Sequence, residues 1–229
     1  MTASLPGIVL GLLVGLRHAF EPDHLAAVGT FVGEHRDGKR GVVLGALWGL
    51  GHTLSLFVVG IVLAVFGASL PAGLAAGFEL AVAVMLVGLG IRAIRRAIRV
   101  DGVGPVKTHS HGGRQHAHAD AASHVHIAGR VVLWRPLAIG LVHGLAGSGA
   151  LTALVFAELP STALRLGYIA LFGIGSIAGM AIATGIAGAS LGTFARAPQT
   201  RRRLAVLTGA ISIAIGILWG IPMAALLLA

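Results

Sequence analysis

The octapeptide Arg17-His18-Ala19-Phe20-Glu21-Pro22-Asp23-His24 interrupts an otherwise apolar segment, residues 5–32. Five of its eight side chains are ionisable, and such groups at membrane depth cost several kcal/mol each unless they are paired or hydrated. Pro22 has no N–H to donate and disfavours helical backbone at Glu21. The alternative, a loop joining two short helices at the membrane surface, leaves halves that are too short to span. We therefore expect one broken span with a polar site at the break.

The composition is that of an integral membrane protein. Of the 229 residues, 56% are hydrophobic and 11% are charged, whereas a soluble domain has about 25% charged residues. The formal net charge of +9 does not indicate a nucleic-acid partner, because nucleic-acid binders spread basic side chains over a polar surface that this chain lacks. The absence of cysteine excludes disulfides, thiolate metal sites and dithiol redox chemistry.

Six apolar segments have the length of about 20 residues that a helix needs to cross a bilayer. We expect an all-α membrane protein with six transmembrane helices, the first of them broken. The six segments are residues 5–32, 41–66, 78–98, 137–157, 166–191 and 204–228.

The basic residues predict the orientation. All but two of the 17 Lys and Arg residues lie in the first, third and fifth connections between these segments or at their flanks; the exceptions are Arg17 and Arg165. Short cytoplasmic loops carry this excess of positive charge. We expect a multi-pass protein of the plasma or inner cell membrane, with both termini outside and the central connection in the cytoplasm.

The two halves of the chain resemble each other. Gly15-Leu16-Arg17-His18 matches Gly140-Leu141-Val142-His143, 125 positions later, and Gly49-Leu50-Gly51-His52 matches Gly173-Ile174-Gly175-Ser176, 124 positions later. Because each half has three spans, the second copy must be inverted, which is a recurrent transporter design. We expect two inverted three-helix repeats, residues 1–99 and 136–229, joined by a cytoplasmic loop, residues 100–135.

Glycines within the spans predict close helix packing, since small residues let membrane helices approach one another. The alternative is that glycine is simply commoner in membrane helices. The expected contact positions are Gly45, Gly49, Gly60, Gly173, Gly175 and Gly179.

The octapeptide has the chemistry of a transition-metal site. On a regular helix, His18 and His24 would point apart, because six residues turn the helix by roughly 240°. Unwinding near Pro22 can bring His18, Asp23 and His24 to one centre. Two imidazoles and a carboxylate suit a divalent ion such as Ni²⁺, Co²⁺ or Zn²⁺.

His52 is a fourth candidate ligand, because it lies about halfway along the second predicted span. The alternative interpretation is a core histidine whose nitrogens are satisfied by Thr53, Ser55 or a neighbouring carbonyl.

The spacing of His18 from Asp23-His24, with four residues between, resembles the signature of the nickel/cobalt transporter superfamily (the NiCoT and NicO group). Leu50-Gly51-His52-Thr53 is similar to the Gly-His-Ser/Thr element in that family's next span. The resemblance implies metal recognition by His18, Asp23, His24 and His52. The acidic motifs of the eight-span importers are missing from the later spans, which indicates a shorter branch.

Further residues are candidates for lining the ion pathway or for orienting the metal ligands. Arg17 and Glu21 either pair with each other or orient the ligands. His143 stands at the repeat position of His18, and it is a fifth ligand, a proton relay, a gate residue or a helix-packing histidine. Thr53 and Ser148 complete this group.

The central loop predicts an accessory metal site. Six of the 11 histidines gather there, and His-x-His pairs in a Gly/Ala/Ser context chelate Ni²⁺, Co²⁺ or Zn²⁺ without needing a fixed structure. The alternative is a plain hydrated linker. The loop histidines are His109, His111, His116, His118, His124 and His126.

These features predict a transporter of divalent transition-metal ions, Ni²⁺ or Co²⁺ in the first place and Zn²⁺ by shared chemistry. The ion is substrate, and no cofactor is expected. The partners are the metal ion, the lipid bilayer and a cytoplasmic metallochaperone. The chain is predicted not to be an enzyme; the two rival interpretations are an intramembrane zinc-dependent hydrolase and a membrane metal-storage or accessory protein for nickel enzymes.

Overall fold

Seven helices account for most of the described chain. A computed structural model describes residues 4–32, 38–66, 70–99, 107–111, 114–118, 125–127, 130–132, 134–146, 159, 161–195 and 197–228. The helices are α1 (Ser4–His18), α2 (Pro22–Val32), α3 (Gly38–Phe66), α4 (Ala72–Arg99), α5 (Trp134–Leu145), α7 (Thr162–Phe194) and α8 (Pro198–Leu228).

Four of these helices are long and apolar enough to cross a membrane: α3, α4, α7 and α8. Their large apolar side chains are widely exposed, among them Leu218 at 70% and Val84 at 63%. A soluble monomer rarely exposes a large apolar surface, whereas lipid covers one at no cost. The chain is therefore a multi-pass membrane protein.

The first and fourth predicted spans are not single long helices. The first is interrupted as expected, because α1 ends at His18 and α2 begins at Pro22, and the two helices have 15 and 11 residues. Proline suits the first position of a helix, where its missing N–H is not needed. The fourth begins as α5, with 12 residues, and the rest of the predicted segment lies outside the described residues.

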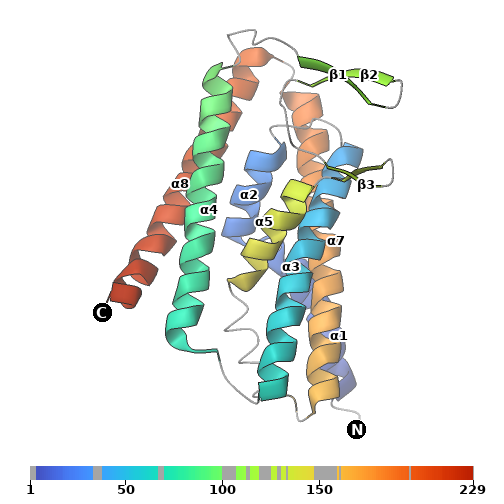
Figure 1. Ribbon diagram of the computed structural model, residues 1–229, viewed down its shortest axis with the longest axis vertical. Coiled ribbons are helices and arrows are strands. Elements are labelled where there is room, and N and C mark those ends of the chain that lie inside the picture. The colour runs from blue at the N-terminus through green and yellow to red at the C-terminus, as the bar shows by residue number, and fades with distance from the viewer. Residues whose placement is uncertain are drawn as a thin grey trace.

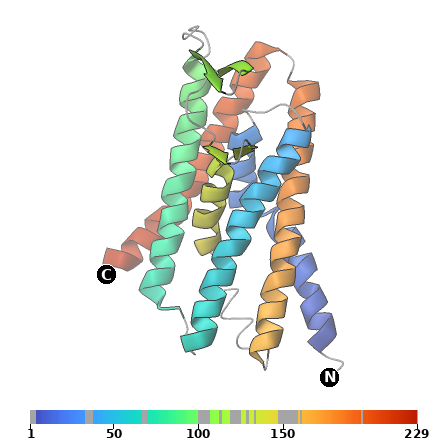
Figure 2. The same cartoon turned by 45° about the vertical axis from the view of Figure 1, so that its right-hand side comes forward.

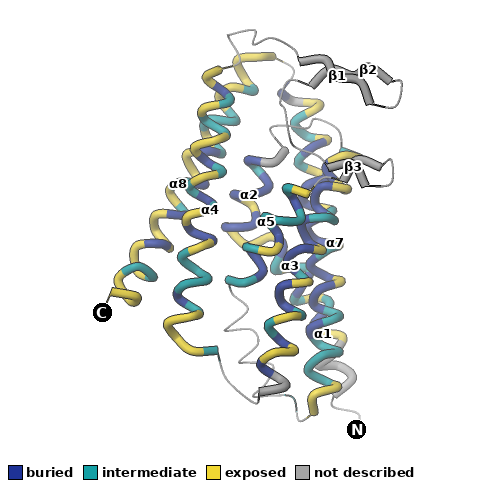
Figure 3. The backbone as a smooth tube through the Cα atoms, viewed as in Figure 1, coloured by how far each residue is buried: buried dark blue, intermediate teal, exposed yellow. Residues whose placement is uncertain are grey.

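The helices pack in two groups around short central pieces. Figures 1 and 2 show α4 beside α8, and α7 between α3 and α1, with α2 and α5 between these two groups. Buried residues concentrate in α2, α3 and α7, while much of α4 and α8 is exposed (Figure 3). The long helices thus present apolar faces outward, and the short helices are enclosed.

Glycines set the closest approaches between helices. A Cβ added at Gly15 would meet the backbone of Phe172, and one added at Gly140 would meet the backbone of Trp48. The six glycines predicted at contacts all lie against another helix, so the close-packing interpretation is confirmed there; at each, an added Cβ would come within 3 Å of a neighbouring atom, at Gly45, Gly49, Gly60, Gly173, Gly175 and Gly179.

The central loop contains strands that were not predicted. Strand β1 (Lys107–His111) pairs antiparallel with β2 (Arg114–His118), and β3 (Val125–Ile127) pairs with β4 (Arg130–Val132). Gly112-Gly113 separates the first pair, and a Gly-Gly pair between two short strands is a sequence signal for a hairpin. Both hairpins lie toward the upper end of Figure 1, opposite the N-terminus.

Candidate metal centre

The break between α1 and α2 brings the octapeptide's polar groups together. The amide of Phe20 donates to the carbonyl of Arg17 at 2.9 Å, and the amide of Glu21 donates to that of His18 at 3.0 Å. This tight turn ends α1, so that His18 is its last residue and Asp23 lies in the first turn of α2.

Three imidazoles from three helices meet at this break. The ring centroids of His18 and His24 lie 4.4 Å apart, and His52 of α3 lies 5.2 Å from His18 and 5.4 Å from His24. His24 and His52 are each 1% exposed, whereas the side chain of His18 is 15% exposed. The structure thus brings these three predicted ligands into one buried cluster.

His143 of α5 joins the cluster from the second half of the chain. Its ring centroid lies 4.1 Å from that of His24 and 6.2 Å from that of His52, and the residue is 1% exposed. The resulting ligand groups form two sets that share His24. We call His18, His24 and His52 the first triad, and Asp23, His24 and His143 the second triad; within each, one ligand atom per residue lies within 4.8 Å of the others.

Two carboxylates hold the imidazoles in place. Asp23 Oδ1 lies 3.0 Å from His24 Nδ1, Asp23 Oδ2 lies 2.8 Å from His143 Nε2, and Glu21 Oε2 lies 2.9 Å from His18 Nδ1. A histidine that donates one ring N–H to a carboxylate leaves its other nitrogen as a metal ligand, with the ring orientation fixed. Glu21 therefore orients His18, and Arg17 is exposed at the end of α1.

Several ring nitrogens are buried with no hydrogen-bond partner among the described residues. They are His24 Nε2, His143 Nδ1 and both nitrogens of His52. Buried polar atoms in proteins are nearly always hydrogen-bonded, and neutral imidazole nitrogens are common ligands of Ni²⁺, Co²⁺ and Zn²⁺. The cluster fits a divalent transition-metal ion by its donor set and by these available lone pairs.

Among the described residues, neither Thr53 nor Ser55 bonds the ring of His52, as the interpretation as a satisfied core histidine would require. The Thr53 hydroxyl donates to the carbonyl of Gly173 at 3.2 Å, and the Ser55 hydroxyl donates to that of Leu141. These hydrogen bonds connect α3 to α7 and to α5, and neither of them involves the ring of His52.

Two aromatic side chains enclose the cluster and were not predicted. Trp48 lies 5.5 Å from His24 and 5.6 Å from His143 between ring centroids, and Phe172 lies 5.3 Å from His18. Trp48 precedes His52 by one helical turn, which is the spacing that could have identified it. The two aromatics also stand 124 positions apart, at matching places in the two halves.

The described histidines of the central loop lie in the hairpins and belong to neither triad. His109 and His116 are Cα partners across the β1–β2 hairpin, His111 and His118 belong to the same two strands, and His126 belongs to β3. Ser148 and His124 lie outside the described residues.

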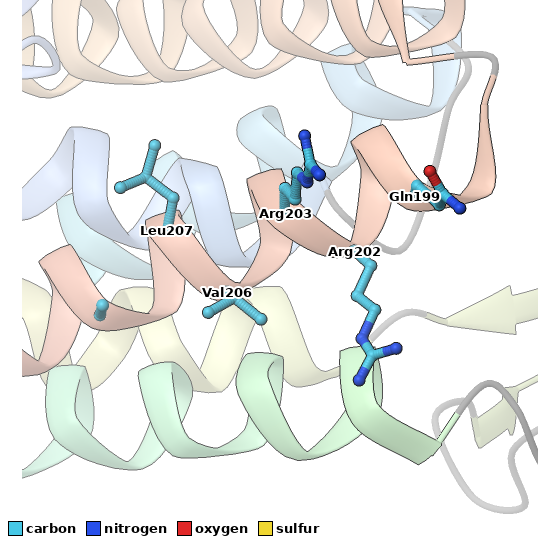
Figure 4. Close-up of a pocket in the computed structure, with 6 residues that line it drawn as sticks. Gln199, Arg202, Arg203, Val206 and Leu207 are labelled. Atoms are coloured by element: carbon cyan, nitrogen blue, oxygen red, sulfur yellow. The ribbon is translucent and has the colours of Figure 1, made fainter.

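A surface pocket of about 650 Å³ lies elsewhere, along the N-terminal part of α8. Figure 4 shows Arg202 and Arg203 leaving the helix on different sides, with Leu207 on the side of Arg203 and Val206 on the side of Arg202. None of the residues lining it belongs to the histidine cluster.

Comparison with known proteins gives one informative relative. The chain is 32% identical over 211 residues to the urease accessory protein UreH of Bacillus sp. (strain TB-90), a match that covers 92% of this chain and 88% of that protein. No family model and no solved structure matches it. Identity at this level over nearly the whole of both sequences shows common descent, and the chain therefore belongs to the family of the urease accessory protein UreH.

Proposed function

We propose that the protein transports a divalent transition-metal ion across the membrane, and that the ion binds in the histidine cluster at the break between α1 and α2. One observation carries the proposal: three imidazoles from α1, α2 and α3 converge in a buried site, where three of their ring nitrogens have no hydrogen-bond partner among the described residues. Burying such groups is costly unless they serve a ligand.

Nickel is the proposed substrate, with cobalt next. An imidazole-rich set with one carboxylate binds both, and zinc as well. The relationship to a urease accessory protein favours nickel, since urease is a nickel enzyme. The resemblance of the octapeptide to the signature of the nickel/cobalt transporter superfamily supports the same choice.

The assignment of ligands is supported by the hydrogen bonds. His18, His24 and His52 are the proposed imidazole ligands. Asp23 supplies the negative charge that a dication needs in a low-dielectric site, and it holds His24 through Nδ1. The described cluster gives Glu21 a positioning role, because it binds the Nδ1 of His18.

Reciprocal helix contacts support two inverted repeats. Gly15 packs on the backbone of Phe172, and Gly140, its counterpart, packs on the backbone of Trp48, the counterpart of Phe172. A second reciprocal set also exists: Gly175 lies against the carbonyl of Leu12, as Gly51 lies against that of Leu137. Rocking of one repeat against the other would expose the site to each side in turn.

The charge distribution supports a cytoplasmic location for the hairpin end. Arg95 and Arg99 lie near the end of α4, and Arg135 and Arg202 lie near the beginnings of α5 and α8. These helix ends lie on the side of the hairpins in Figure 1. Both termini would then face outside. The loop histidines are proposed to exchange the ion with a cytoplasmic metallochaperone.

Uptake of radiolabelled Ni²⁺ into proteoliposomes tests the proposal. We expect the wild-type protein to accumulate nickel, and His18→Ala and Asp23→Ala to lose that activity. Transport by both variants at the wild-type rate would show that the site is assigned wrongly.

A metal-storage or accessory role is the second candidate, and the name of the urease accessory relative favours it. Deleting residues 103–129 separates the two functions. A transporter retains flux without this loop, whereas a storage protein whose histidine-rich loop is its working part loses its function. The hydrolase interpretation has less support, because Glu21, its only local general base, is engaged by His18.

A further inference from the structure

We propose that the ion occupies two successive positions that share His24, first in the first triad and then in the second triad. His143 is then the ligand through which the second half of the chain receives the ion. This inference rests on the proposed transport function and deepens it, because it gives the order in which the ligands act.

The geometry separates the two positions. His24 lies between the other imidazoles, with ring centroids 4.4 Å from His18 and 4.1 Å from His143, while His52 and His143 are 6.2 Å apart. The two sets of mutually close ligand atoms have only His24 in common. An ion can therefore pass from one set to the other with His24 as the common ligand, because Nε2 of that ring releases the ion as Nδ1 binds it.

Exposure and charge give the direction of the step. His18 is the most accessible member of the cluster, with a side chain 15% exposed, and His143 is 1% exposed. The first triad consists of imidazoles alone, whereas the second contains the buried carboxylate of Asp23. A dication that has shed water is stabilised by an adjacent anion in a low-dielectric site. The ion thus enters at His18 and moves toward Asp23.

The hydrogen bonds allow the step without net gain or loss of protons. With the first triad occupied, His24 binds the ion through Nε2, and the Nδ1 hydrogen is donated to Asp23. With the second triad occupied, His24 Nδ1 and His143 Nε2 bind the ion. The hydrogens that these two nitrogens directed at Asp23 leave on water that accompanies the ion, and His24 Nε2 and His143 Nδ1 each take up one hydrogen from that water. Those two nitrogens are buried without a hydrogen-bond partner among the described residues.

The packing of α5 couples this step to the second half of the chain. Gly140 lies against the backbone of Trp48, and Gly144 lies against that of His52, so α5 is in direct backbone contact with the helix that carries the first triad's third ligand. An ion that is bound by Asp23 and His143 links α2 to α5. A movement of α5 relative to α3 would then displace the bound ion.

The competing explanation is that His143 only positions Asp23 and does not bind the ion. The variant His143→Gln distinguishes these two roles. The glutamine amide retains an N–H donor near the position of Nε2, but it lacks an imidazole. We expect H143Q to keep nickel binding in equilibrium dialysis at the first triad and to lose nickel uptake by at least about tenfold. Uptake at the wild-type rate would overturn the proposal, and so would loss of binding together with uptake, which indicates a single site.

A measurement on the loaded protein keeps the proposal testable even if H143Q does not fold. Nickel-edge X-ray absorption reports the ligands of bound Ni²⁺ in the wild type and in Asp23→Asn. We expect two imidazoles and a carboxylate in the wild type, and three imidazoles in D23N. An unchanged ligand set would overturn the two-position model. If wild-type vesicles accumulate no nickel, the transport function fails, whereas these spectra still decide whether two positions exist.

Discussion

His52 is a buried imidazole that makes no hydrogen bond to the described residues through either ring nitrogen. Leaving such atoms unpaired costs about 1–3 kcal/mol, whereas an apolar side chain of similar shape avoids that cost. Stability and metal binding therefore make opposite demands at this position.

The first prediction concerns His52→Phe. We expect the metal-free variant to be as stable as the wild type, or more stable by about 1–3 kcal/mol. Mutation of a residue that only hydrogen-bonds a metal ligand lowers metal affinity by roughly 10–100-fold. Because His52 is proposed as a ligand itself, we expect the nickel affinity of this variant to fall by more than that. Thermal unfolding and nickel titration measure the two effects, and Thr53→Ser, which keeps the hydroxyl bond to Gly173, is the matched control. Unchanged nickel affinity would contradict the assignment.

The sequence singles out His18, Asp23, His24 and His52 as candidate ligands, because ionisable groups in an apolar segment carry a high energetic cost. It does not identify the bridge that Asp23 forms between His24 and His143. That contact depends on how closely α5 approaches α2, and the approach is set by glycine contacts far from Asp23 in the sequence.

At the scale of the helices, the crossing of α3 and α5 depends on residues without side chains. A Cβ at Gly140 would meet the carbonyl of Trp48 and lie 2.9 Å from the amide of His52. Because backbone atoms cannot turn away as a flexible side chain can, the two helices would have to separate.

The second prediction concerns Gly140→Ala. We expect a loss of about 1–3 kcal/mol in unfolding free energy from overpacking, together with reduced nickel uptake as His143 moves away from Asp23. Gly77→Ala in α4 is the control, since nothing lies within 4 Å of its added Cβ. Alanine is the better helix former by about 1 kcal/mol, so the control should be neutral or stabilising. Equal behaviour of the two variants in denaturant unfolding would refute the packing argument.

Hydropathy and proline chemistry predict α3, α4, α7, α8 and the interruption before α2. They do not predict the hairpins of the central loop, because strands of three to five residues carry little periodic signal. Nor do they give where α5 ends, since the apolar pattern continues past Leu145 while this described helix stops there.

At the scale of the whole molecule, the basic residues gather toward the end that carries the hairpins, and the N-terminus lies at the opposite end (Figure 1). A bilayer with a cytoplasm on one side distinguishes these ends by the positive-inside rule.

The third prediction uses the absence of cysteine, which makes single-cysteine labelling free of background. We expect Leu70→Cys, between α3 and α4, to react with a membrane-impermeant maleimide in intact cells. Thr108→Cys, in β1, should react only after the cells are opened. The reverse pattern would mean that the hairpins face outward.

The most direct test of the account is a crystal structure of the nickel-loaded protein with anomalous scattering recorded at the nickel edge. The account predicts an anomalous peak in contact with His24 and with either His18 and His52 or Asp23 and His143. A peak confined to the histidines of the central loop, or no peak at saturating nickel, would contradict it.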